Sequence, residues 1–375
     1  MFSISPFREG SWVIFFVFMG FMTFSLLRPL PVIVPNIPMH TVLDGDNTPV
    51  QMPLAVKGIV GWGSFLPMTH RPDLLYKGGG ELGRKIFSMY IISWIYPDVL
   101  NDNAVWGTPY NLEALLAYDD DIVVINNVYF GGMAFGSDDL QRLGIHAIET
   151  SSKIENDDEY LKSNVRVMNT LVKQPQFTHT VLDRYFQGFL TLEHDLQPQK
   201  ITDRPNVIGV GAPSNNWARL FVIRIDEVKQ NQLALSSPTK QELASGRQQD
   251  PERILSIDPD IIMLLGTERR DFMSDPRWQG LKAVQTNKVY ENSMKISGSR
   301  YDIDNLPIGA RWMAEITHPE IMRPKLRETI TKYYSDAYGY TLSDTQLDDI
   351  LLIDKNKDAS GYKRFMRQGG SCEAK

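Results

Sequence analysis

Two glutamates at matching positions are the side chains whose type and spacing most directly suggest chemistry. Glu113 follows Asn111 and Glu252 follows Asp250, and in both places an apolar helical pattern continues to an Asp-x-Asp turn. An Asn or Asp at such a position caps a helix, so each glutamate falls in a first helical turn. A carboxylate there can stabilise the positive end of its own helix, or it can pair directionally with arginines of another surface.

Aromatic and arginine side chains in or near loops after predicted strands are the second group of candidates. Ligands of open α/β sheets bind at the carboxyl ends of parallel strands, so we expect these side chains to line a cleft. Flat apolar rings and arginine donor forks together suit an anionic metal chelate. The candidates are Trp62, Tyr129, Trp217, Arg224, Arg270 and Tyr301. The alternative for each aromatic residue is ordinary packing, and for Arg269 and Arg270 it is a solvated loop pair.

The patterns of catalytic and metal sites are missing from the sequence. The six histidines form no H-x-x-x-H or H-E-x-x-H pair, and the chain has no G-x-S-x-G, phosphate-binding glycine loop or dinucleotide fingerprint. We therefore expect no catalytic residue, no cofactor and no metal site formed by local spacing. Direct binding of zinc or manganese by residues that only the fold brings together stays open.

Charge and cysteine usage exclude further classes of protein. The formal charge of -6 and the pI near 5.6 argue against a nucleic-acid binder. Cys372 is the one cysteine, so no disulfide can form within the chain.

An apolar run near the N-terminus indicates export. Residues 12–27 carry no charge, Arg8 precedes them, and Arg28 and several prolines follow them. The run is long for the core of a signal peptide and slightly short for a membrane span. We expect a signal peptide or an uncleaved anchor through which the chain could contact the membrane; a buried core helix is the alternative.

Alternating strand and helix patterns predict an α/β fold. Short apolar runs at 57–60, 121–125 and 145–148 predict one set of strands, and those at 206–210, 261–265 and 288–290 predict a second set. A long helical pattern between the two sets contains Pro175, where we expect a kink or break. Trp278 and Trp312 are expected in the core.

An internal repeat supports two similar halves. Residues 111–125 align without gaps on residues 250–264, and each copy reads as capped helix, turn and buried strand. We therefore predict two Rossmann-like lobes with parallel sheets, bridged by a long α-helix, with a ligand cleft between them. The predicted ranges are 1–28 for the signal peptide or anchor, 29–53 for a linker or entry strand, 54–155 for the N-terminal lobe, 156–202 for the bridging helix, 203–312 for the C-terminal lobe, 313–352 for C-terminal helices and 353–375 for a polar tail.

Several motifs in this order resemble one family. The repeated unit is similar to N-x-E-x-L-L-x-x-x-P-D-I-V-I, residues 275–290 to DPxWxxLxAVxxGKVY, residues 312–320 to WLAxxLHPE, and residues 333–339 to FYxxFYG. These patterns are typical of substrate-binding proteins of ABC importers of the helical-backbone class. The resemblance spans about residues 50–352; it departs at Asp120, where the family has proline, and is weak over 61–96.

The resemblance implies a non-enzymatic, monomeric protein of the periplasm or cell surface. It would deliver a small molecule to a permease dimer served by a cytoplasmic ATPase, with Glu113 and Glu252 docking on permease arginines. Iron–siderophore is the cargo we expect first, and haem, cobalamin or an oxyanion such as molybdate are alternatives within the fold. A membrane-anchored ligand sensor is the alternative outside transport.

Overall fold

The computed structural model describes residues 39–43, 46–53, 58–60, 92–97, 122–126, 137–149, 157–172, 175–197, 201–212, 221–224, 250–293 and 305–367. The predicted signal peptide or anchor lies outside this part of the chain. None of the helices within it is both long and apolar enough to cross a membrane.

A four-stranded sheet forms the centre of the second half. Its order is β7-β6-β8-β9, with β6 at Val207–Gly211, β7 at Phe221–Arg224, β8 at Ile261–Leu264 and β9 at Val289–Glu291. β6, β8 and β9 are parallel, and β7 runs antiparallel to β6. Alternate residues of β8 enter different cores: Ile261 and Met263 join one cluster, Ile262 and Leu264 another. A strand buried on both faces explains why this run has no polar alternation.

The helix that precedes β8 confirms the second copy of the repeat. α9 (Pro251–Ile257) is capped by Asp250, whose side chain accepts the Glu252 N–H, and ends at Asp258 in the left-handed conformation. Three short helical segments then cover one face of the sheet, namely α10 (Arg269–Ser274), η9 (Pro276–Trp278) and α11 (Lys282–Gln285). Trp278 is fully buried there and stacks on Phe272 with ring centroids 5.2 Å apart.

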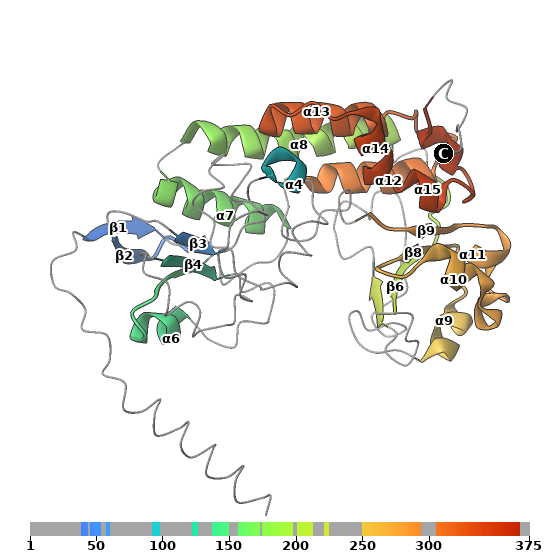
Figure 1. The fold of residues 1–375 in the computed structure, drawn as a ribbon, viewed down its shortest axis with the longest axis horizontal. Coiled ribbons are helices and arrows are strands. Elements are labelled where there is room, and N and C mark those ends of the chain that lie inside the picture. Colours follow the sequence, from blue (N-terminus) through green and yellow to red (C-terminus); the bar gives the residue numbers. More distant parts are fainter. Residues whose placement is uncertain are drawn as a thin grey trace, which may run out of the picture.

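The first half contains a separate parallel sheet. Its order is β3-β4-β5, with β3 at Gly58–Val60, β4 at Ile122–Asn126 and β5 at His146–Glu149. α6 (Ser137–Arg142) precedes β5, and Gly144 between them takes a φ of 78°, which only glycine adopts at little cost. β1 (Met39–Leu43) and β2 (Pro49–Pro53) form an antiparallel pair. The expected α/β fold with two distinct sheets is confirmed, although the second sheet has an antiparallel edge strand, β7, that was not predicted. Figure 1 shows the two sheets at opposite ends of the molecule.

The segment that joins the halves is a pair of helices. α7 (Asp157–Val172) and α8 (Pro175–Leu196) are separate, and Pro175 is the first residue of α8, where its missing N–H costs no helical hydrogen bond. The expected break at this proline is therefore present. The Tyr185 hydroxyl donates to Asp158 Oδ1 at 2.8 Å, which ties the middle of α8 to the start of α7.

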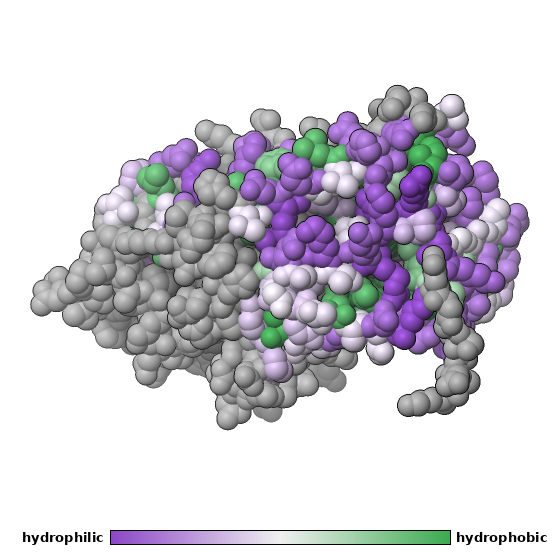
Figure 2. Space-filling view, turned by 90° about the horizontal axis from the view of Figure 1, so that it is seen from above, coloured by the Kyte–Doolittle hydropathy of each residue, from purple (hydrophilic) through white to green (hydrophobic). Residues whose placement is uncertain are grey.

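C-terminal helices complete a layer beside α8. They are α12 (Leu306–Thr317), α13 (Leu326–Tyr338), α14 (Asp344–Ile350), α15 (Ile353–Asn356) and η11 (Tyr362–Phe365). One core cluster joins these helices to the second sheet, includes the buried Trp312, and has Trp94 and Ile95 of α4 (Ile92–Ile95) packed against it. From above, the described part of this layer is mostly hydrophilic, with isolated apolar residues (Figure 2).

Residues 353–367 differ from the expected polar tail. Ile353, Tyr362 and Phe365 are buried in the same cluster as Trp312, although most of their neighbours in sequence are exposed. No helical or strand period marks the burial, because Ile353 ends the apolar run 350–353 before a polar stretch, and Tyr362 and Phe365 lie mostly among Gly, Lys and Arg residues.

Candidate functional site

The carboxyl end of the second sheet is the described region in which the sequence places a ligand. The chain leaves β6 at Ala212 and β8 at Gly266, and the Thr267 hydroxyl joins the two exits by accepting the Ala212 N–H at 3.0 Å. Thr267 is buried, with 4% of its surface exposed. This hydrogen bond ties the first residue after β6 to the segment that follows β8.

The neighbouring arginines at this end have different roles. Arg269 is buried; its backbone N–H donates to Glu291 Oε1 at 2.6 Å and its Nε donates to the Val289 carbonyl at 2.8 Å. Arg270 has 87% of its side chain exposed and pairs only with the adjacent Asp271, at 3.2 Å, among the contacts described for it. The alternative of a solvated pair is therefore excluded for Arg269, and Arg270 is the arginine that a solute can reach.

Carboxylates lie beside Arg270 at the same end. Glu291, the last residue of β9, is partly buried, and burial raises the pKa of its carboxyl group, although the Arg269 N–H favours the ionised form. Glu268 is exposed and forms an ion pair with Lys355. Glu291 was not among the predicted site residues. It could have been found, because it directly follows the predicted strand at 288–290.

Arg224 lies further from this end than its sequence context suggests. The antiparallel register pairs Phe221 with Gly211 at the carboxyl end of β6, and Arg224 with Ile208. Three residues of strand span about 10 Å. The backbone of Arg224 is therefore nearer the amino end of β6.

The predicted docking glutamate of the second half is solvent-exposed. Glu252 lies in the first turn of α9, and its backbone N–H donates to Asp250 Oδ1 at 3.0 Å. Since α9 runs back along the sheet to enter β8 through Asp258–Asp260, its first turn lies toward the carboxyl end of the strands. The side chain is thus accessible to a partner on the same side as the predicted ligand loops.

The remaining predicted residues lie outside the described part of the chain. They are Trp62, Tyr129, Trp217, Tyr301 and Glu113. In the first sheet the register pairs Asn126 with Glu149 at the carboxyl ends of β4 and β5. Within the described residues, no three His, Cys, Asp or Glu side chains lie close enough together to hold a metal ion.

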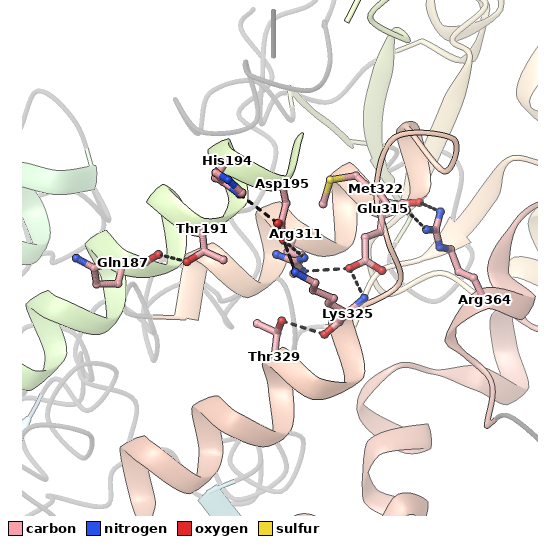
Figure 3. A network of polar contacts seen from close by, with 10 residues as sticks. All are labelled: Gln187, Thr191, His194, Asp195, Arg311, Glu315, Met322, Lys325, Thr329 and Arg364. Carbon is pink, nitrogen blue, oxygen red and sulfur yellow. Dashed lines mark hydrogen bonds and ion pairs between the residues drawn. The ribbon is translucent and has the colours of Figure 1, made fainter. Parts of the chain in front are cut away.

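A buried ionic network fixes the helical layer that carries the second sheet (Figure 3). Arg311 of α12 donates to Asp195 of α8 at 2.6 Å and to Glu315 at 3.1 Å, while the Lys325 N–H donates to Glu315 Oε1 at 3.0 Å. Burial opposes ionisation of Asp195, but Arg311 and Lys325 outweigh it and lower the pKa of that carboxyl group. Burial raises the pKa of Glu315 although the Lys325 N–H and the Arg311 and Arg364 side chains favour its ionised form. The two carboxyl groups of one network therefore shift in opposite directions.

Backbone contact adds to this attachment of α12. A Cβ at Gly188 of α8 would lie 2.6 Å from Pro307 Cβ of α12, so the two helices touch where glycine has no side chain. Leu192 and Leu196 continue the contact against Ala310 and Ala314. α8 and α12 thus form a frame for the second sheet.

Comparison with known proteins identifies the fold. No family model matches the sequence, and neither does any curated protein. A periplasmic solute-binding protein of Veillonella parvula superposes with a TM-score of 0.66 at 19% identity, covering 86% of this chain and 99% of that one. The TroA-like binding protein FepB of the same organism gives 0.60 at 16% identity, covering 82% and 98%. The molybdate-binding protein MolA of Haemophilus influenzae gives 0.59 at 14% identity, covering 81% and 99%.

These matches define a class of fold. The chain has the two-sheet α/β architecture of TroA-like periplasmic binding proteins of ABC transporters. It spans nearly the whole of each neighbour, so the similarity is to the complete binding protein and not to one lobe.

Proposed function

We propose that this chain is the substrate-binding component of an ABC importer, without catalytic activity of its own. The observation that carries the proposal is the match of the whole fold to periplasmic binding proteins over 98–99% of their length. A permease and an ATPase are then its partners. The N-terminal apolar run would export the chain, so that it works in the periplasm or at the cell surface as a monomer.

A metal chelate, with an iron–siderophore as the first expectation, is the cargo we propose. Arg270 supports an anionic ligand, since it exposes a positive charge at the carboxyl end of the second sheet. Structures of this fold hold different ligands: MolA is described with molybdate, HmuT as heme-binding, and CeuE of Helicobacter pylori with Ni(II). The residues at the carboxyl ends of the strands, and not the fold, must therefore select the cargo.

Native mass spectrometry of the protein purified from its own host tests both parts. We expect a non-covalent adduct with the mass of a metal chelate, and loss of uptake of that compound when the gene is deleted. An oxyanion, haem or cobalamin adduct would replace the cargo but keep the importer role. Unchanged uptake of the bound compound in the deletion strain would refute the importer role.

The proposed docking function involves Glu113 and Glu252. Glu252 is exposed on the side of the second sheet where the ligand loops lie, so one face of the molecule could present both cargo and docking carboxylate to a permease. Carboxylate–arginine pairing would give this contact its orientation.

A further inference from the structure

β9 is an edge strand of the second sheet within the described residues. In the order β7-β6-β8-β9, one side of β9 faces β8 and the other has no neighbouring strand. Lys288 O accepts from Ile262 and the Asn292 N–H donates to Leu264 O, so these residues face β8. By alternation, the backbone groups of Asn287, Val289 and Glu291 face outward. Unpaired groups in such a row would accept a strand from another chain.

Side chains, and not a strand, bond the Glu291 N–H and the carbonyls of Glu291 and Val289 on this side. The Glu291 N–H donates to Asn356 Oδ1 at 2.8 Å, and Asn356 Nδ2 donates to the Glu291 carbonyl at 2.9 Å. The Val289 carbonyl accepts from Arg269 Nε at 2.8 Å. Asn356 is completely buried. One amide side chain therefore gives Glu291 the donor and acceptor that a neighbouring strand would supply.

The residues after Asn356 extend this contact along β9 and onto α12. The Ser360 N–H donates to Asn287 O at 2.9 Å, and the Tyr290 hydroxyl donates to Ser360 O at 2.7 Å. Further on, the Tyr362 hydroxyl accepts from Trp312 Nε1 at 3.3 Å, and Arg364 donates to the Glu315 carbonyl at 2.7 Å. The same short segment thus binds both β9 and α12.

We propose that residues 353–367 are a clamp that closes the outer side of β9 against a further strand and ties β9 to α12, with Asn356 as its positioning residue. If the proposed binding function holds, the clamp keeps Glu291, which bonds the Arg269 N–H, in place at the carboxyl end of the strands without touching the ligand.

Hydrogen exchange of the full-length protein, without ligand, tests the clamp. Asn356→Leu keeps a similar volume but removes both hydrogen bonds to Glu291, so peptides covering 287–293 should exchange about tenfold faster. Asn356→Asp keeps the acceptor for the Glu291 N–H and loses the donor, and should give an intermediate rate. Lys357→Ala, an exposed neighbour, is the matched control and should exchange like the wild type.

Faster hydrogen exchange confined to peptides near β9 in Asn356→Leu, with exchange in α9 and β6 unchanged, would support the clamp. Equal rates in Asn356→Leu and the wild type would overturn it. Uniform acceleration across the whole chain would also overturn it, because Asn356 would then contribute only to global stability. None of these outcomes depends on a ligand, so failure of the clamp is distinguishable from failure of the proposed transport function.

Discussion

Arg269 and Arg270 are adjacent in sequence but differ in surroundings. Arg269 is buried and bonded to β9. Arg270 is exposed to solvent and forms a surface ion pair with Asp271. Such pairs contribute little to stability. A substitution at Arg270 can therefore change ligand affinity without disturbing the fold.

Arg270→Ala should weaken binding of an anionic ligand by roughly tenfold or more, because a charged hydrogen bond contributes about 1.5–3 kcal/mol. Isothermal titration with the co-purified ligand measures the effect, and the melting temperature should stay constant. Arg277→Ala removes another exposed, paired arginine of the same lobe and serves as the control. Unchanged affinity in Arg270→Ala would remove this residue from the site.

Glu315 should make stability depend on pH in a direction opposite to that of most carboxylates. Its pKa is raised by burial, so the folded chain binds a proton more readily than the unfolded chain, whose pKa is near 4.5. The charged form therefore destabilises the fold as pH rises from about 4.5 through the raised pKa. The glutamine of a Glu315→Gln variant cannot ionise. The difference in unfolding free energy between this variant and the wild type should shift in favour of the variant between about pH 4 and pH 7, as measured by urea unfolding.

Asp195→Asn is the internal control for that experiment. Asp195 has a lowered pKa, so the stability that it contributes is present above pH 3.8 and is lost as pH falls through the lower, folded value. A constant difference between Glu315→Gln and wild type at both pH values would show that Glu315 does not titrate in this range.

The role of a residue could be predicted where the local sequence pattern determines its place in a helix or in the core. Asp250 caps α9 and Trp278 is buried, as the patterns indicate. The burial of Arg269 and Asn356 could not be predicted, because it depends on the outward groups of β9, which only become known once the strand order is known. The same patterns leave the predicted aromatic residues untested, since these lie outside the described part of the chain.

At the scale of elements, the contact of α8 with α12 leaves no room for a side chain at Gly188. An added Cβ would lie 2.6 Å from one proline ring carbon and 2.9 Å from another, and the ring of Pro307 cannot rotate away. Alanine favours a helix by about 1 kcal/mol over glycine, but overpacking typically costs about 1–3 kcal/mol.

Gly188→Ala should therefore lower stability by up to about 2 kcal/mol, measured by thermal or urea unfolding. At Gly280 an added Cβ meets nothing within 4 Å, so Gly280→Ala provides a matched control that should be close to neutral. Stabilisation by Gly188→Ala would mean that the helices separate without cost and do not form a rigid frame.

Strands and helix breaks could be predicted from the sequence, because short apolar runs and proline residues determine the local backbone conformation. Runs of β-branched residues between turns predicted β4, β6 and β8, and Pro175 predicted where α8 begins. The packing of α4 against the C-terminal cluster had no such signal, since it joins residues far apart in the chain through a few apolar contacts.

At the scale of the whole molecule, the docking hypothesis predicts that ligand binding and permease docking depend on different residues. Glu113→Arg with Glu252→Arg should abolish uptake in cells, because reversed charges would repel the arginines of a permease. Ligand affinity of the purified variant should be unchanged, since Glu252 is exposed in the first turn of α9 and makes no described side-chain contact with the ligand loops.

Glu193→Arg with Glu328→Arg makes the same charge change at exposed positions of α8 and α13 and controls for net charge. Retained uptake in the variant changed at Glu113 and Glu252 would exclude docking through these carboxylates, and lost ligand affinity would mean that they serve the binding site instead.

The clamp also has a consequence for how the protein is synthesised. Asn356 lies 65 residues beyond its partner Glu291, and Tyr362 lies 50 beyond Trp312. A nascent chain that has left the ribosome only as far as α12 still has an open strand and an incomplete core. The second half can complete this core only after residues 353–367 have emerged.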